Sequence, residues 1–143
     1  MTREELIKEI EEEIKRKIRI LDILRRILGI QTQLEKLQTE LMVRNVCKDE
    51  GLSDKEADLI VAVIKCESGM NPRAINKNPD GTYDYGLCQF NSYWYIEKMK
   101  LITKEEALYN PEKAVRLMIK RYREGFLNDW VCYKTKKYLA YLS

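Results

Sequence analysis

The chain has 143 residues, of which 45% are hydrophobic and 34% are charged, and its formal net charge is +3. This apolar share is enough for a buried core, which excludes wholesale disorder, and the length suits one ordinary domain plus an extension. Histidine is absent, so Ser-His and Cys-His nucleophile pairs and His-ligated metal sites are excluded. A net charge this small gives no reason to expect a nucleic-acid partner.

Residues 1–44 are predicted to form one long amphipathic helix. Thr2 and Glu5 have the spacing of a capping box, and apolar residues recur every three or four positions. The apolar stripe consists of Ile7, Ile10, Ile14, Ile18, Leu21, Leu24, Leu28, Leu34, Leu37 and Leu41. A helix of this length needs a partner for its stripe, which leaves three alternatives. It folds back at Gly29 as a helical hairpin, it pairs with another chain as a homo-oligomeric coiled coil, or its basic segment 15–30 lies on an anionic membrane surface.

Neither a membrane span nor a targeting segment is recognisable. No apolar run approaches the roughly 18 residues that a membrane span requires. The acidic segment 1–13 lacks the apolar stretch of a signal peptide. The localisation is therefore left unassigned, and action outside the membrane would require delivery by another route.

Residues 45–143 are predicted to form a separate domain that is mostly α-helical with one small β hairpin, an α+β class. Ser53 is the expected N-cap of a helix that ends near Gly69. The turn-forming residues 76–81 and the strand-like residues 82–85 predict the hairpin. Further helices are expected over 89–99, 103–108 and 111–123, followed by short helical or irregular structure over 130–141.

Four cysteines, Cys47, Cys66, Cys88 and Cys132, all lie in this second part of the chain. None belongs to a C-x-x-C pair, so a zinc site is not indicated. The even count allows two disulfides in three connectivities, or four small buried thiols in a reducing compartment.

Glu67 is the first candidate for chemistry. It lies where the predicted helix ends, and burial and the partial negative charge of a helix C-terminus both raise the pKa of a carboxyl group there. Such a group can act as a general acid near neutral pH. Asp84 follows on the predicted strand, and a strand folded against the helix end would place two carboxylates across one cleft, as in glycosidases. Gln89 and Asn91 supply amide groups suited to sugar hydroxyl and N-acetyl groups.

The pairs Glu67-Ser68 and Asp84-Tyr85 and the run Gly86-Leu87-Cys88-Gln89 form one spaced pattern that extends to Trp94. This pattern resembles the catalytic segment of the lysozyme superfamily. It is similar to C-type lysozymes in the spacing of the two acids, and to soluble lytic transglycosylase (SLT) domains in the Glu-Ser pair and the Gly-Leu-x-Gln run. The resemblance implies a lysozyme-like domain that acts on peptidoglycan glycan strands without a cofactor or a metal.

The resemblance also implies roles for individual residues. Glu67 matches the general acid and Asp84 the second carboxylate, while Trp130 would be the apolar neighbour that keeps Glu67 protonated. The expected substrate contacts are Ser68, Tyr85, Gln89, Asn91, Trp130 and Tyr133. If Trp130 walls Glu67, the C-terminal segment approaches the helix end, which favours a Cys66–Cys132 disulfide and leaves Cys47–Cys88 as the second pair.

Three functions are compatible with this pattern. The favoured one is a lytic transglycosylase that cleaves the MurNAc-β-1,4-GlcNAc bond, with Glu67 as general acid, and closes a 1,6-anhydro ring. The alternatives are a hydrolytic lysozyme (muramidase) that uses Asp84 as second carboxylate, and a non-catalytic cell-wall-binding module. The enzymes of phage lysis, the endolysins, include domains of this kind.

The run Asn76-x-Asn78-x-Asp80-Gly81 begins like an EF-hand calcium loop. The twelfth position of such a loop would be Leu87, where a bidentate glutamate is required. We therefore interpret these residues as turn formers and predict no metal site.

Overall fold

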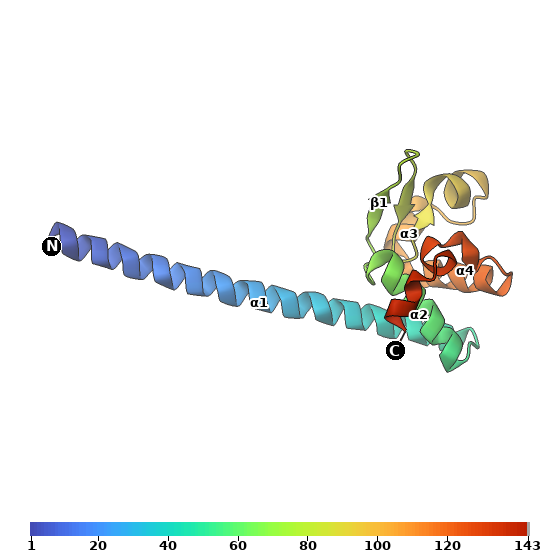
Figure 1. The fold of residues 1–143 in the computed structure, drawn as a ribbon, viewed down its shortest axis with the longest axis horizontal. Helices are drawn as coiled ribbons and strands as arrows, with labels where there is room; N and C mark the ends of the chain where they lie inside the picture. The colour runs from blue at the N-terminus through green and yellow to red at the C-terminus, as the bar shows by residue number, and fades with distance from the viewer. Residues whose placement is uncertain (143) are drawn as a thin grey trace. The chain divides into compact units, whose positions relative to one another are not determined.

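The computed structural model describes residues 1–142, which form two compact units, Met1–Glu35 and the chain from Lys36 onward (Figure 1). Helix α1 (Arg3–Asp49) contributes residues to both units. The division falls earlier than the boundary expected at residue 44, because Val43 is completely buried in the core of the second unit. The last turns of α1 are therefore part of the second fold.

Helix α1 begins with the predicted capping box. The backbone N–H of Glu5 donates to Thr2 Oγ1 at 3.1 Å, and the N–H of Thr2 donates to the Glu5 carboxylate at 2.8 Å. The helix passes through Gly29 without interruption, so the hairpin alternative is wrong. Among the described residues, no helix is long and apolar enough to span a membrane.

The helices of the second unit begin and end largely where the sequence predicts. Ser53 caps α2 (Asp54–Ser68) in a capping box with Glu56, and Gly69 ends it in the left-handed conformation. Thr103 caps α3 (Lys104–Tyr109) in the same way, and α4 (Pro111–Arg123) carries a proline in its first turn. Three short elements close the chain: η2 (Leu127–Asp129), α5 (Val131–Lys134) and η3 (Lys137–Tyr141).

A small antiparallel sheet holds the predicted hairpin and one further strand. Its order is β1 (Ile75–Lys77), β2 (Tyr83–Tyr85), β3 (Phe90–Asn91). The register places Asp84 beside Asn76 on one side and Asn91 on the other. The chain over 89–99, expected to be one helix, instead forms β3 and a π-helix, η1 (Ser92–Lys98). The cause is Gln89, whose positive φ of 53° interrupts helical geometry.

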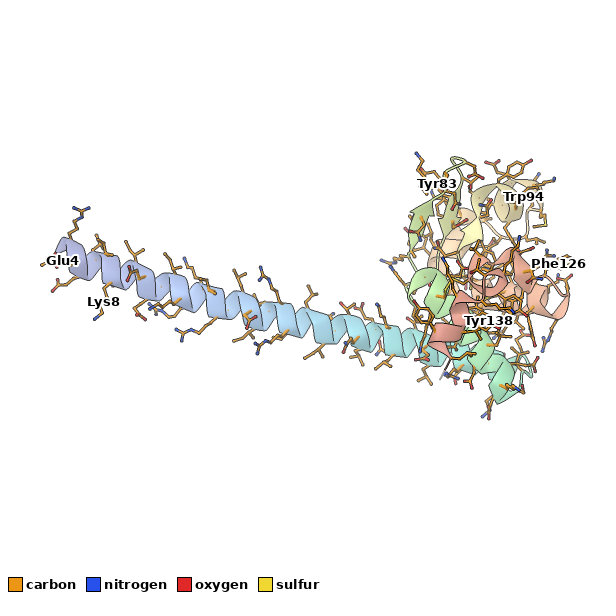
Figure 2. All side chains as sticks on the ribbon, viewed as in Figure 1. Glu4, Lys8, Tyr83, Trp94, Phe126 and Tyr138 are labelled. Atoms are coloured by element: carbon orange, nitrogen blue, oxygen red, sulfur yellow. A yellow bond between two sulfur atoms is a disulfide. The ribbon has the colours of Figure 1, made fainter. Side chains whose placement is uncertain are left out.

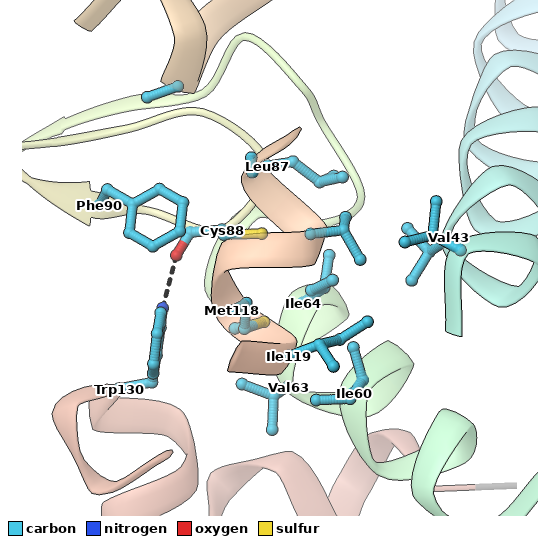
Figure 3. Packing of buried hydrophobic residues seen from close by; sticks show 14 of the residues in the cluster. Val43, Ile60, Val63, Ile64, Leu87, Cys88, Phe90, Met118, Ile119 and Trp130 are labelled. Carbon is cyan, nitrogen blue, oxygen red and sulfur yellow. Dashed lines mark hydrogen bonds between the residues drawn. The ribbon is translucent and has the colours of Figure 1, made fainter. Parts of the chain in front are cut away.

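The core of the second unit lies between α2, α4 and the sheet (Figure 3). Its largest fully buried side chains are Phe90, Ile60, Ile64, Leu87, Met118 and Ile119. The predicted Cys66–Cys132 disulfide is present, with a Cα–Cα distance of 6.0 Å, so this prediction is confirmed. The predicted Cys47–Cys88 bond is wrong: both thiols are free and buried, and they pack as small hydrophobic side chains. Burial raises the pKa of the Cys47 thiol to about 11 and that of Cys88 further still.

Candidate active site

A cleft of about 540 Å³ opens in the second unit, a size usual for ligand sites. The end of α2 contributes Glu67, and the sheet contributes Asp84 and Asn91. The C-terminal segment contributes Trp130 and Val131. Two carboxylates from different elements, the end of α2 and strand β2, therefore line one cavity, as the glycosidase interpretation requires.

Glu67 is half-buried in the last turn of α2, and its Oε1 accepts a hydrogen bond from the backbone N–H of Cys132 at 2.9 Å. Burial raises the pKa of its carboxyl group most, and the negative charge of Asp84 raises it further. The Cys132 N–H lowers this pKa, but the net shift is upward. A carboxyl group of this kind is suited to donate a proton near neutral pH.

The Cys66–Cys132 disulfide lies directly beside this hydrogen bond. One of its cysteines precedes Glu67 in the chain, and the other carries the N–H that Glu67 accepts. The covalent link therefore ties the end of α2 that carries Glu67 to the start of α5. It keeps the Cys132 N–H in place as a donor to Glu67.

Trp130 forms an apolar wall of the cleft and is itself held in place by three contacts. Its indole N–H donates to the carbonyl of Cys88 at 2.6 Å, the dashed line in Figure 3. Its ring meets Phe90 and Tyr95, with centroids at 5.8 and 5.7 Å. Only 3% of Trp130 is exposed. Trp130 and Glu67 therefore line the same cleft, and the effect of this ring on the Glu67 carboxyl group stays a prediction.

Asp84 is oriented by Asn91, its cross-strand neighbour. Asn91 Nδ2 donates to Asp84 Oδ1 at 3.1 Å and to Thr82 Oγ1 at 3.0 Å. Asn91 Oδ1 accepts the N–H groups of Tyr93 and Trp94 and so caps η1. Both N–H bonds of this amide are therefore used within the protein, and Asn91 acts on Asp84 rather than presenting free donors to a sugar.

Gln89 is also engaged within the protein. Its Nε2 donates to the carbonyls of Ala74 at 3.1 Å and Gly86 at 2.9 Å, and its Oε1 accepts from Asn76 Nδ2 at 2.8 Å. The residue is 7% exposed. Because both of its N–H bonds are spent on the loop between β2 and β3 and on the chain before β1, Gln89 braces the sheet that carries Asp84.

Three of the expected substrate contacts lie elsewhere. Ser68 Oγ donates to the carbonyl of Ile64 at 3.2 Å. Tyr85 stacks with Tyr83 and Tyr133 stacks with Tyr138, at centroid distances of 6.0 and 5.2 Å. Of the described residues that line the cleft, none is Ser68, Tyr85 or Tyr133.

The cleft is also lined by apolar side chains that were not among the expected substrate contacts. Trp94 and Phe126, labelled in Figure 2, and Met99 are 51%, 45% and 38% exposed. Flat or flexible apolar side chains in an open cleft suit stacking against sugar rings. Composition signalled that aromatic residues were plentiful, but not which of them remained exposed.

Residues of the calcium-like run also reach the cleft, where they serve the turn. Asp80 Oδ1 accepts from the Thr82 N–H at 2.9 Å and from its hydroxyl group at 2.7 Å, which lowers the pKa of Asp80. Asn78 Nδ2 donates to Thr82 Oγ1 at 3.1 Å. Within residues 1–142, no group of three potential metal ligands comes together.

The family model of the transglycosylase SLT domain matches residues 46–134. The chain therefore belongs to the transglycosylase SLT domain family, and the resemblance found in the sequence is confirmed. The match begins in the last turn of α1 and includes Glu67, Asp84 and Trp130.

Relatives of known name are similar over parts of their length. Lysozyme C-1 of Anas platyrhynchos is 31% identical over 86 residues, which cover 53% of this chain and 58% of that protein. The invasion protein IagB of Salmonella typhimurium is 36% identical over 63 residues, covering 43% of this chain and 39% of that protein. The chain thus matches between two fifths and three fifths of these relatives.

A solved structure extends the likeness to the fold. A lysozyme from Litopenaeus vannamei superposes with a TM-score of 0.55 at 24% identity, over 68% of this chain and 84% of that one. The mostly helical, lysozyme-like fold class is therefore confirmed, and the long helix α1 precedes it.

Proposed function

We propose that this protein cleaves peptidoglycan glycan strands at the MurNAc-β-1,4-GlcNAc bond, with Glu67 as the general acid. The observation that carries the proposal is the setting of Glu67: half-buried, in one cleft with Trp130, and with its pKa raised by burial and by Asp84. Membership of the SLT family supports the same substrate. The exposed rings along the cleft supply surfaces for several sugar units.

The chemistry follows from the protonated state of Glu67. Its carboxyl group donates a proton to the glycosidic oxygen while the bond from that oxygen to the muramyl C1 breaks. The sugar gains positive charge at C1, and the Asp84 carboxylate lies in the same cleft to stabilise it. The Cys132 N–H, already bonded to Glu67 Oε1, stabilises the carboxylate that remains.

For the second step we favour the lytic transglycosylase route. The Glu67 carboxylate takes the proton of the muramyl 6-hydroxyl group, and the oxygen of that group bonds to C1 and closes a 1,6-anhydro ring. No water enters the product. The SLT family match is the support for this choice.

One observation favours the hydrolytic alternative. Asn91 holds the Asp84 carboxylate in place, and the register of the sheet sets these two residues side by side. A fixed second carboxylate is what a lysozyme uses to stabilise or capture the cation before water completes the reaction. The non-catalytic wall-binding alternative draws no support from a cleft that retains both acids.

Mass spectrometry of products from purified peptidoglycan separates the three functions. We expect muropeptides lighter by one water than the products of hydrolysis, and none from Glu67→Gln. Asp84→Asn should reduce turnover mildly in a transglycosylase and nearly as severely as Glu67→Gln in a hydrolase. Products of full mass would replace our choice with the muramidase, and intact glycan bound by the protein would leave only the binding module.

The disulfide supports a site of action outside the reducing cytoplasm. Disulfides persist in oxidising compartments, and the cell wall lies in such a compartment. We propose that the protein acts in such an oxidising compartment, outside the cytoplasm. Fractionation of producing cells, with the thiol state of Cys66 read by alkylation, tests this. Enzyme found only reduced and cytoplasmic would contradict it.

A further inference from the structure

The unit Met1–Glu35 is one helix that carries a continuous apolar surface along its length. Every residue through position 38 is exposed (Figure 2). One row of apolar side chains follows the helix, each 45–63% exposed: Ile7, Ile10, Ile14, Ile18, Leu21, Leu24 and Leu28. A second row, Ile20, Ile23, Ile27, Ile30 and Leu34, widens this surface from residue 20 onward. A surface of this extent is characteristic of an interface.

The charges along the same helix are separated into two blocks. Residues 3–13 contain six acids and two bases, and residues 15–26 contain six bases and one acid. The first apolar row runs through both blocks, from Ile7 to Leu28. Within the helix the blocks touch at their junction, through the ion pairs Glu12–Lys15 and Glu13–Arg16.

We propose that residues 4–28 bind the same segment of a second copy of this chain in antiparallel orientation. A parallel pair in register would set acidic block on acidic block and basic on basic. An antiparallel pair sets each acidic block on the basic block of the other copy, so the apolar rows meet between attracting charges.

The heptad spacing defines the alignment. Residues 7, 14, 21 and 28 occupy the first seam position (a) of the heptad, and residues 10, 17 and 24 occupy the second (d). In an antiparallel pair each a residue faces a d residue of the other copy, and in this alignment the two residue numbers always sum to 31. Ile7 then meets Leu24 of the second copy, and Ile10 meets its Leu21. Glu4 flanks the seam opposite Arg25 of the second copy. Lys17 is the one polar seam residue in this stretch, a kind that fixes register at a cost in stability.

An anionic membrane fits the same segment less well. The basic block with its apolar residues would bind such a surface. The acidic block continues the same apolar row through Ile7 and Ile10 but would be repelled by anionic lipid, so that part of the row would stay uncovered. An antiparallel second copy places an oppositely charged block beside each of the two blocks and covers the whole apolar row.

Light scattering and spin-label distances on the full chain test the proposal. Lys8→Cys offers one reactive thiol for the label, because Cys47 and Cys88 are buried and the other two cysteines are bonded. We expect a dimer whose labels lie about 22 Å apart along the helix axis, from 15 residues at 1.5 Å each. A parallel dimer would bring them side by side. Lys15→Cys is the matched control, since its labels are close in either orientation.

Charge reversal and salt give a second, independent test. Glu4→Lys/Glu11→Lys should weaken the dimer at least tenfold, while Glu97→Lys/Glu105→Lys, an equal charge change in the second unit, should leave it unaltered. Added salt should also weaken the wild-type dimer, because it screens attraction, whereas it would strengthen a parallel pair. A monomer at all concentrations, a short Lys8 distance, or a monomer that binds anionic vesicles would each overturn the proposal.

Discussion

At the scale of single residues, the carboxyl group of Glu67 links the proposed catalysis to the stability of the fold. Its folded-state pKa lies above the ordinary value of 4.5, because burial and Asp84 both disfavour the charged form. Between these two pKa values the folded state binds more protons than the unfolded state, so the free energy of unfolding falls as pH rises through that window. Burial of the carboxyl group that we propose as general acid therefore comes at a cost to the stability of the fold.

We expect Glu67→Gln to lose about 10²-fold or more in turnover and yet to be more stable than the wild type at pH 7. Glutamine fills the same space without a charge to bury. The stability gain should vanish below about pH 4, where both proteins are uncharged at this position. Urea unfolding at the two pH values measures it, with Glu97→Gln as a control for loss of one exposed acid. A gain that is the same at both pH values would contradict the assignment.

Asn91 is the residue on which the geometry of Asp84 depends most directly. Asn91→Ala removes the bond to Asp84 Oδ1 and the cap of η1, so we expect a loss of about 1–2 kcal/mol in stability and a clear drop in turnover. Asn78→Ala is the matched control, because it removes one bond to Thr82 in the turn between β1 and β2 without touching Asp84. Equal turnover of the two variants would separate Asp84 from the mechanism.

At the scale of elements, the disulfide joins the end of α2 to the start of α5. Cross-linking residues 66 apart constrains the unfolded chain, so the double variant Cys66→Ala/Cys132→Ala should lose about 2–5 kcal/mol in the free energy of unfolding. The turnover rate should fall by a larger factor than the affinity for glycan, because the Cys132 N–H is no longer held against Glu67. Dithiothreitol should reproduce both effects in the wild type and change nothing in the double variant.

The turn between β2 and β3 depends on a close approach at Gly86. A Cβ at this position would lie 1.8 Å from the carbonyl oxygen of Ala107, and φ is 80°. We expect Gly86→Ala to cost more than about 3 kcal/mol, because backbone of α3 must move. Gly81→Ala has φ of 88° and no neighbour within 4 Å, so it should cost only about 1–2 kcal/mol. Thermal unfolding of both variants measures the difference. Gly81→Ala reports the cost of the positive φ alone, and Gly86→Ala reports that cost together with the steric clash against Ala107.

At the scale of the whole molecule, sequence predicted what short-range chemistry decides. The caps at Thr2, Ser53 and Thr103 and the glycine end of α2 need only neighbours three or four residues away. The predicted helical hairpin at Gly29 is wrong, because one glycine destabilises a helix by only about 1 kcal/mol and does not end it. The predicted helix over 89–99 is wrong, because Gln89 is held in its non-helical conformation by hydrogen bonds to Asn76 and Ala74, which are distant in the sequence.

The site divides along the same line. Glu67, Asp84 and Trp130 were predicted because their spacing resembles a known pattern, and the structure brings all three to one cleft, while their roles stay predictions. Tyr85 was misplaced because successive strand residues face opposite sides, so a cleft that receives Asp84 turns its neighbour away. A pattern of residue types also does not reveal whether the donors and acceptors of an amide are already bonded within the protein, as those of Asn91 are.

The bond from Cys132 to Glu67 also has a consequence for the order of synthesis. The donor follows its acceptor by 65 residues, and the disulfide spans 66. A nascent chain that has passed Asp84 already holds both acids, yet it lacks the wall and the donor that tune the first of them. Peptides released before residue 130 should therefore be inert toward glycan, so that cleavage begins only after the ribosome has finished the part of the protein that makes it possible.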